Sequence, residues 1–575
     1  MKTNTKTKKN TINFDGFGGV DLTKTHSDIF SARSIENFRV LNDGSLEKRQ
    51  GYRFLSDLGG TVRAFWGGML DGSYTLFMLI DDTLCFIIPE TGERMPLFTV
   101  GTSSGSACFF FFRETLYLLD GEKIYEFTGL EFNETVGYVP LVAKDWVNDY
   151  IGEINEPRNI LNRHARATYT VSDTPSIYLC AGEPIESVEA VYVNHALLSS
   201  SRYSINHTFN TINVQGLAAG DKVEVFFTYQ NGYDDLMTKL CSATSSALFG
   251  GIGSNRIFLC GGSCYGTVFA SKNVSRFDIA LSQKHYPQSN GLYIPVGYEF
   301  EAGDGIAAVQ AIARQYGHIL IFTESDVWMI TPDDDGSEFA SATGVNGRIG
   351  CPVAGGATVS ENEPVSIGAH SVFAWETDSQ RKCDAQSISK PIDAELSEEY
   401  LKSCSLYYDA TRNELWLYSS SQNYAWIYNT VRKAWYKFTG ICADTIFDLN
   451  GSLCFIRDGK MFVFDDDCYV DTDENGESLP ISASYVTSFS DLGTTDFKNL
   501  SSVTLRADLY SEPLLLRFDG EGTASVSWNL SDSSESEHSL IDKRVFTGRT
   551  KYFSLTLASN GNERQKIHSL TVYTR

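Results

Sequence analysis

Acidic side chains at alternate positions form the most suggestive chemical pattern in this 575-residue sequence. Asp471, Asp473 and Asn475, followed by a glycine, resemble the start of a calcium-binding loop, in which oxygen ligands alternate and glycine is sixth. The twelfth position holds Ser482 instead of a bidentate glutamate, and Pro480 precedes it. The pattern therefore favours a solvated acidic linker and leaves a weak calcium site as the alternative.

Three further acidic groups, Asp81-Asp82, Asp333–Asp335 and Asp465–Asp467, follow apolar, strand-like segments. Paired carboxylates can act as general acid and general base. Acidic residues at the end of an apolar strand are also typical of solvated hairpin turns. We interpret the three groups as hairpin ends, with acid–base catalysis as the alternative.

A Gly-x-Ser-x-Gly motif spans Gly101–Gly105 and contains Ser103. In hydrolases this motif places the serine on a turn from a strand to a helix. The following residues, ACFFFFRETLYLL, are strand-like, so the required context is missing. No metal-ligand or triad spacing links the nine histidines, which are His26, His164, His195, His207, His285, His318, His370, His538 and His568. We therefore expect no catalytic, cofactor-binding or metal-ligating residues, no cofactor and no enzyme activity.

The twelve cysteines stand mostly singly in apolar segments, as Cys85, Cys180, Cys260 and Cys454 do. Such residues behave as small, reduced hydrophobic side chains, and no Cys-x-x-Cys pair indicates a zinc site. Cys260 and Cys264 are four apart, with no histidine nearby to complete one. We expect free thiols and synthesis in a reducing cytoplasm.

The formal charge is −25, from 47 basic and 72 acidic residues, which argues against a broad basic surface for clamping nucleic acid. No apolar stretch approaches the length of about 20 residues that a membrane span needs. The first thirteen residues carry Lys2, Lys6, Lys8 and Lys9, and no apolar region follows them. Residues 1–13 therefore predict a flexible basic arm that contacts protein or DNA, and no secretion signal.

Strand–turn–strand units recur along the chain. Glu114–Phe127 and Gly451–Phe464 both alternate apolar residues, break at Asp-Gly and resume with a lysine. Asp-Gly between alternating segments is a strong hairpin signal. Related units of roughly 40 residues, a period typical of β-propeller blades, begin near Val62, Ser103, Leu240, Gly305, Gly350, Ser403 and Ile441. Tyr407–Phe438 fits one four-stranded blade best, whereas a sandwich of unrelated hairpins is the alternative.

Two segments lack this repeat of strand–turn–strand units. Residues 155–233 contain short strands at regular spacing and predict a β-sandwich inserted into the propeller. Residues 479–575 contain longer alternating strands and predict a C-terminal β-sandwich. Helical patterns are confined to Ser397–Cys404 and Gly305–Gln315. The expected fold is all-β, with residues 14–154 and 234–478 forming the propeller.

The N-terminal segment carries a family resemblance. It contains Gly18-Gly19, Asn37–Val40, Asp43–Leu46 and Lys48–Tyr52 in this order. This series resembles the opening of tail nozzle proteins of short-tailed bacteriophages, also called tail tubular protein B or packaged-DNA stabilisation protein, although Gln50 replaces the usual proline. Tyr485–Leu509 resembles the closing domain of that family. The propeller segments match by pattern alone.

The resemblance implies a virion structural protein, localised in the tail after assembly in the host cytoplasm. It implies a homo-oligomeric ring, normally a hexamer, below the portal and adaptor proteins. Such a ring forms the distal channel through which DNA passes without sequence-specific binding, and it offers a docking platform for tail fibres. The alternatives are a stand-alone β-propeller binding protein and a carbohydrate-active hydrolase.

Overall fold

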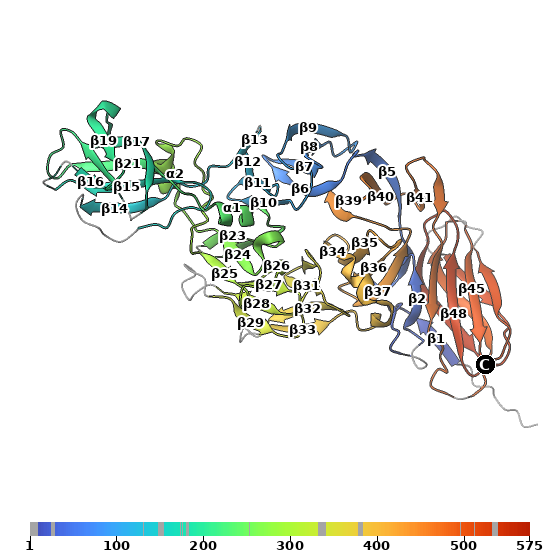
Figure 1. The fold of residues 1–575 in the computed structure, drawn as a ribbon. Coiled ribbons are helices and arrows are strands. Elements are labelled where there is room, and N and C mark those ends of the chain that lie inside the picture. The colour runs from blue at the N-terminus through green and yellow to red at the C-terminus, as the bar shows by residue number, and fades with distance from the viewer. Residues whose placement is uncertain are drawn as a thin grey trace, which may run out of the picture.

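The computed structural model describes residues 10–24, 29–129, 131–147, 155–172, 174, 176–179, 183–251, 254–331, 341–377, 383–494, 496–510, 512–531 and 539–575. Nearly all of the regular elements are β-strands. They form a β-propeller, a sandwich inserted into it, and a terminal sandwich that unites strands from both ends of the chain (Figure 1). The protein is all-β, as the sequence predicts.

Seven four-stranded antiparallel units form the propeller blades, which we number in chain order. Six of them are separate sheets, and blade 6 is the first part of a nine-stranded sheet. Successive first strands contact each other, so they surround the centre of the propeller. The strands of blades 1 to 3 are β6 (Val62–Leu70), β7 (Ser73–Ile80), β8 (Thr83–Ile87) and β9 (Arg94–Thr99); β10 (Cys108–Phe112), β11 (Thr115–Leu119), β12 (Ile124–Phe127) and β13 (Phe132–Glu134); and β22 (Ser245–Gly251), β23 (Ser254–Cys260), β24 (Thr267–Ala270) and β25 (Glu299–Glu301).

The remaining blades follow in the same manner. Their strands are β26 (Val309–Gln315), β27 (His318–Thr323), β28 (Val327–Ile330) and β29 (Thr343–Asn346); β30 (Ala357–Ser360), β31 (Glu363–Ile367), β32 (Val372–Thr377) and β33 (Cys383–Ser387); β34 (Cys404–Asp409), β35 (Glu414–Ser419), β36 (Tyr424–Asn429) and β37 (Ala434–Thr439); and β38 (Thr445–Leu449), β39 (Ser452–Arg457), β40 (Lys460–Asp465) and β5 (Gly51–Asp57).

The seven predicted unit starts correspond to the seven blades. Each lies within seven residues of the first residue of an innermost strand. The Asp-Gly pairs at Asp120 and Asp458 both connect the second and third strands of their blades, 2 and 7. The internal repeat that the hairpins suggested is therefore a repeat of blades.

Blade 7 closes the propeller with a strand from the other end of the sequence. The outer strand β5 pairs antiparallel with β40, with Phe54 opposite Phe462 and Tyr52 opposite Phe464. Between blades 7 and 1, an apolar cluster includes Phe447. Because β5 directly precedes blade 1, the closing hydrogen bonds join the first and last parts of the propeller.

The terminal sandwich begins much earlier in the sequence than expected. Residues 10–13, assigned to the flexible arm, belong to β1, which pairs with β49. Residues 14–48, assigned to the propeller, supply β2, which pairs with β43, and β4, which pairs with β49. The expected boundaries were wrong because these pairings join residues more than 400 positions apart, which local periodicity cannot reveal. Residues 1–9 lie outside the described part.

Two sheets form the terminal sandwich, one of which continues through β2 into blade 6. The first sheet has the order β3-β4-β49-β44-β47, with β1 also on β49, and the second has the order β2-β43-β48-β45-β46. The strands are β1 (Asn10–Phe14), β2 (Ala32–Glu36), β3 (Phe38–Val40), β4 (Leu46–Lys48), β43 (Ala483–Thr487), β44 (Leu500–Asp508), β45 (Leu514–Gly520), β46 (Val526–Leu530), β47 (Ser539–Arg544), β48 (Phe553–Ser559) and β49 (Lys566–Thr574).

The inserted sandwich lies between blades 2 and 3 in the sequence. Its strands are β14 (Leu141–Val147), β15 (His164–Thr170), β16 (Ser176–Tyr178), β17 (Ile185–Val193), β18 (Ala196–Leu197), β19 (Tyr203–Asn206), β20 (Thr211–Val214) and β21 (Lys222–Tyr229). Its sheets have the orders β14-β15-β21-β17-β18 and β16-β20-β19. It starts before the expected residue 155, because Trp146 and the rest of β14 belong to its core.

Helices are few and short among the described residues. They are α1 (Asp234–Cys241), α2 (Arg276–Gln283), α3 (Glu398–Lys402) and the 3-10 turns η1 (Ser200–Arg202), η2 (Gly262–Cys264) and η3 (Asp393–Glu395). The helical pattern within Ser397–Cys404 is confirmed by α3. The one at Gly305–Gln315 is wrong, because Val309–Gln315 form β26, which is buried between neighbouring sheets. No described helix has the length and apolar character needed to cross a membrane.

Candidate functional site

The N-terminal motif residues converge where the terminal sandwich meets blades 6 and 7. Asn37, between β2 and β3, has a positive φ of 55° and is 3 % exposed. Its amide nitrogen donates to Thr439 Oγ1 and to the Ser482 carbonyl, both at 2.7 Å. Its amide oxygen accepts from Arg49 Nε at 3.0 Å. One asparagine thus connects β37 of the propeller with the segment that enters β43 of the sandwich.

Arg49 forms a buried, bidentate ion pair with Asp471. Its two terminal nitrogens donate to the two carboxylate oxygens at 2.8 and 2.5 Å, and the residues are 1 % and 7 % exposed. Arg49 also donates to the Thr439 carbonyl at 2.9 Å. Paired donors on a planar carboxylate give both strength and direction. The pair fixes the hairpin of β41 (Val470–Thr472) and β42 (Ser478–Pro480) against the junction.

This ion pair changes the interpretation of the calcium-like segment. Asp471 is occupied by Arg49, so it cannot face a metal ion together with Asp473. The Asp473 carboxylate instead accepts from the backbone nitrogens of Asn475 and Glu477, at 2.9 and 2.8 Å. These are the hydrogen bonds of a tight turn. The acidic segment is therefore a hairpin turn, and the geometry does not favour the calcium alternative.

A second buried ion pair, between Arg39 and Glu414, belongs to the same junction. Arg39 pairs with Glu414 and donates to Gln50 Oε1 at 2.9 Å, while the Tyr436 hydroxyl donates to Glu414 Oε1 at 2.7 Å. Burial alone would lower the pKa of Arg39, but the neighbouring Glu414 carboxylate raises it above its ordinary value. We call Arg39, Arg49, Glu414 and Asp471, with Asn37, the junction network.

Glycines allow the chain to approach closely at the junction. A Cβ on Gly51 would lie 1.9 Å from the Val470 carbonyl oxygen, and one on Gly19 would lie 2.7 Å from the Cα of Ala434. Real side chains do not tolerate such distances. The motif glycines therefore serve packing, and the junction network couples the sandwich to the propeller.

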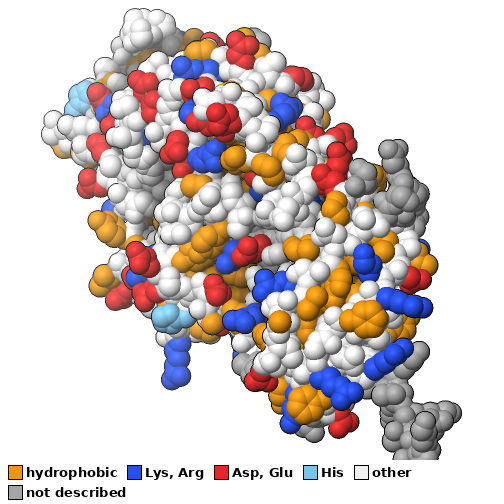
Figure 2. All heavy atoms as spheres, turned by 90° about the vertical axis from the view of Figure 1, so that its right-hand side faces the viewer, with side chains coloured by type: hydrophobic (Ala, Val, Ile, Leu, Met, Phe, Trp, Pro, Cys, Tyr) orange, Lys and Arg blue, Asp and Glu red, His pale blue; other side chains and the backbone are white. Residues whose placement is uncertain are grey.

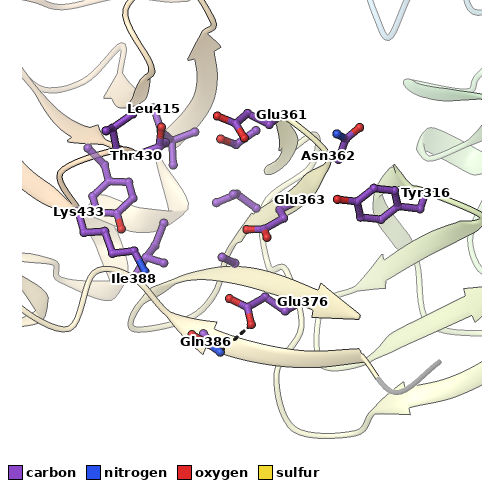
Figure 3. A pocket seen from close by; sticks show the side chains of 15 residues that line it. Tyr316, Glu361, Asn362, Glu363, Glu376, Gln386, Ile388, Leu415, Thr430 and Lys433 are labelled. Atoms are coloured by element: carbon purple, nitrogen blue, oxygen red, sulfur yellow. Dashed lines mark hydrogen bonds between the residues drawn. The ribbon is translucent and has the colours of Figure 1, made fainter. Parts of the chain in front are cut away.

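An acidic cavity of about 250 Å³ lies between blades 5 and 6 (Figure 3). Glu361 and Glu363 reach it from the turn into β31, and Glu376 reaches it from β32. Gln386 Nε2 donates to Glu376 Oε2 at 2.9 Å. Lys433 lines the opposite side, from the turn between β36 and β37. The side chains of this cavity could support acid–base chemistry.

Burial and neighbouring charges shift the pKa of one carboxyl group in this cavity, that of Glu363. Burial, followed by the repulsion of Glu376 and Glu361, raises the pKa of Glu363, and Lys433 opposes the shift. A carboxyl group with a raised pKa is better suited to act as a general acid. The sequence analysis missed these residues, because Glu363 begins an apolar strand and Glu376 lies near the end of another.

The acidic groups singled out in the sequence lie elsewhere. Asp81 and Asp82 form the turn between β7 and β8 of blade 1, whereas Asp465 ends β40 of blade 7 and Asp466 and Asp467 follow it. Asp466 pairs with Arg412 at 2.6 Å. Asp333–Asp335 lie outside the described residues. Each described group occurs at a hairpin or strand end, as expected.

Neither serine nor thiol chemistry receives support from the geometry. Ser103 lies in the loop between β9 and β10, and a strand follows it. The eleven described cysteines are free, and burial raises the pKa of Cys108 to about 11. Cys180 lies outside the described part. Among the described residues, no group of three or more His, Cys, Asp or Glu side chains could hold a metal ion.

One histidine cluster was not foreseen. His164 and His285 flank Glu189, each with a ring nitrogen 3.4 Å from a carboxylate oxygen, and Thr228 donates to the same carboxylate. The cluster joins the inserted sandwich to the segment after α2. The residues are too far apart in sequence for spacing to reveal it. His26 and His538 lie outside the described part.

Comparisons with known proteins give structural similarity alone. No family model matches the sequence, and no curated protein matches it. The fold is similar to PorZ, a surface component of the type-IX secretion system of Porphyromonas gingivalis, with 9% identity and a TM-score of 0.33 over 83% of this chain and 46% of PorZ. It is also similar to the β-propeller domain of Myceliophthora thermophila Cps50 (Swd1), with 10% identity and a TM-score of 0.32 over 72% of this chain and 99% of that domain. The chain thus spans about half the length of PorZ.

Proposed function

We propose that this protein is a virion structural protein, a tail nozzle subunit whose ring forms the distal DNA exit channel. The proposal rests on the uneven distribution of charged residues between the propeller and the rest of the chain. Residues 49–140 and 234–482, which form the propeller, contain 23 basic and 45 acidic residues, whereas the rest of the chain contains 24 and 27. The acidity of the protein is therefore a property of the propeller.

An acidic channel wall suits the passage of DNA. Each phosphate neutralised by a basic side chain adds a salt-dependent attraction with a log–log slope of about −0.9. A closed ring repeats every lining residue in each subunit, so even one inward lysine per subunit would place several cations around the duplex. A wall of carboxylates avoids this attraction and leaves the DNA free to slide.

The junction network suits a subunit whose domains must keep a fixed relative orientation. Arg39 forms a buried ion pair with Glu414 of blade 6, and Arg49 forms one with Asp471 of the hairpin that follows blade 7. A subunit that belongs to a conduit must keep its parts aligned while DNA moves. The two sandwiches lie at opposite ends of the molecule (Figure 1). We assign the docking of tail fibres to the inserted sandwich and contact with adaptor or portal-proximal proteins to the terminal sandwich.

Two measurements on the purified protein test the proposal. Light scattering after gel filtration should give a closed oligomer, for which a hexamer is expected. Retention of double-stranded DNA on the immobilised protein should be absent at low ionic strength. A monomer near 64 kDa at high concentration, or retention that weakens steeply with salt, would overturn it.

A carbohydrate-active hydrolase is the second candidate, favoured by the raised pKa of Glu363 beside Glu376 and Glu361. Retaining and inverting glycosidases use two carboxyl groups, one of which keeps its proton. This candidate requires hydrolysis of a polysaccharide by the wild type that Glu363→Gln and Glu376→Gln both abolish. A stand-alone binding propeller would be a monomer without hydrolytic activity.

A further inference from the structure

A second cavity lies where the inserted sandwich meets helix α2. It has a volume of about 410 Å³. The sandwich contributes residues of β14, β15, β17 and β21, and α2 contributes Phe277, Asp278 and Leu281. The cavity is built from two units of the fold, an arrangement that is common for small-molecule sites.

A buried arginine with too few partners lines this cavity. The Arg166 side chain is 1 % exposed, yet its hydrogen bonding is limited to one bond, from a terminal nitrogen to the Tyr138 hydroxyl at 3.2 Å. Its Nε has no partner. The nearest carboxylate oxygen, on Asp278, is 3.8 Å away, beyond hydrogen-bond distance. A guanidinium offers five donors, and buried donors are normally satisfied. This arginine therefore points to an anionic ligand.

Two of the three lysines that line the cavity, Lys222 and Lys284, are already paired, and Lys144 is the third. Lys222 lies 3.6 Å from an oxygen of Asp145, and Lys284 lies 2.7 Å from an oxygen of Glu224. These pairs give the rim both donors and acceptors. Arg166 is the buried cation of the cavity wall, and most of its hydrogen-bonding capacity is unused.

Aromatic side chains complete the cavity. Phe277 is 71 % exposed on α2, and the Tyr192 ring lies on the sandwich side with the Lys284 ammonium 3.6 Å from its centre. An exposed phenylalanine at the mouth of a polar cavity offers a flat apolar surface. Such a surface suits the C–H face of a sugar ring, while the rim donors and acceptors suit its hydroxyl groups.

We propose that this cavity binds a carboxylate-bearing sugar. Its carboxylate receives two parallel hydrogen bonds from the Arg166 guanidinium, whose planar fork matches a carboxylate. The sugar ring lies against Phe277, and its hydroxyl groups meet the ion pairs of the rim. The site belongs to the inserted sandwich and α2, so it does not depend on the proposed function.

Ligand-observed NMR titrations of the full-length protein with D-glucuronate test this site. Wild type should bind D-glucuronate, and Arg166→Gln should weaken binding about 10- to 100-fold, because hydrogen bonds to charged groups contribute about 1.5–3 kcal/mol. Phe277→Ala, which truncates a largely exposed side chain, should weaken it several-fold. Arg202→Gln, which removes an exposed arginine of the same sandwich, should leave binding unchanged.

Three probes discriminate between ligand classes. D-glucose lacks the carboxylate, benzoate lacks the hydroxyl groups, and inorganic phosphate lacks the planar carboxylate and the ring. The proposal predicts that each binds at least tenfold more weakly than D-glucuronate. Equal or tighter binding of any of the three, no binding of D-glucuronate, or no effect of Phe277→Ala would overturn it.

Discussion

Two arginines in the N-terminal motif show how single residues join distant parts of this chain. Arg39 and Arg49 lie ten positions apart, and their partners Glu414 and Asp471 lie in blade 6 and in the hairpin that follows blade 7. A buried ion pair adds little stability compared with an apolar replacement, but the loss of one partner leaves an unpaired charge in the interior. The motif therefore has a structural role at the junction.

Replacement of one partner should be costly. We expect Arg49→Gln to lower the free energy of unfolding by about 3–5 kcal/mol, because Asp471 would remain buried and unpaired. Urea denaturation of the full chain measures the change. The matched control is Lys460→Gln, which removes the solvent-screened pair with Glu474 and should cost far less. Equal losses in the two variants would refute the buried network.

A glycine of the same motif provides a steric test. Gly51→Ala should strongly destabilise the protein, because the new Cβ would meet the Val470 carbonyl oxygen at 1.9 Å and separate β5 from β41. Gly317→Ala is the control, since nothing lies within 4 Å of its Cβ position. Thermal unfolding midpoints should fall for Gly51→Ala alone. Unchanged midpoints for both variants would contradict the close approach.

The histidine cluster predicts a pH dependence. Burial would raise the pKa of Glu189, but hydrogen bonds from His164 and Thr228 outweigh it and lower the pKa from 4.5 to about 2. A lowered folded-state pKa contributes stability that is present above pH 4.5 and is lost as the pH falls towards 2. The stability difference between wild type and Glu189→Gln should therefore shrink across this interval in urea titrations.

Glu186→Gln, which removes an exposed pair, serves as control. A difference that is constant or grows on acidification would count against the cluster.

At the scale of elements, local signals were sufficient for the blades. Alternating strands and Asp-Gly turns are short-range features, and they predicted seven units, the blade at Tyr407–Phe438 and the inserted sandwich. The sequence could not reveal that β5 closes blade 7 or that β1–β4 complete the terminal sandwich, because both depend on pairing across the whole chain. The false helix at Gly305–Gln315 arose because a doubly buried strand lacks alternation.

The corrected boundary of the inserted sandwich can be tested directly. A fragment of residues 141–233 should be soluble and unfold cooperatively, because it includes β14 and the Trp146 side chain of the core. A fragment of residues 155–233 lacks this strand and should unfold at lower temperature or aggregate. Circular dichroism melting curves compare them. Equal stability would show that β14 is dispensable.

Side-chain sites were harder to foresee than strands. Glu363, Arg166 and Glu189 belong to no motif of recognisable spacing, and each acquires partners through packing of separate elements. Motif spacing reveals a site when one element supplies most of its groups. In this fold, neighbouring blades or the inserted sandwich and α2 share each site, so spacing carries no signal.

At the scale of the whole molecule, the propeller is acidic and the terminal sandwich is close to neutral. Residues 1–48 and 483–575 together contain 18 basic and 17 acidic residues. Figure 2 shows Lys and Arg side chains interspersed with hydrophobic ones at the sandwich end of the molecule. A surface of this composition can contact another protein without strong charge repulsion, whereas the propeller would repel nucleic acid. The division of charge suits a subunit that binds proteins and admits DNA.

Electron microscopy of the purified protein, first in negative stain and then at a resolution that places side chains, tests the central claim most directly. The account predicts closed rings, with six subunits expected, whose narrowest bore is lined mainly by carboxylates and small polar residues of the propeller. Single 64-kDa particles without rings, or a bore with net positive charge, would contradict the proposed conduit.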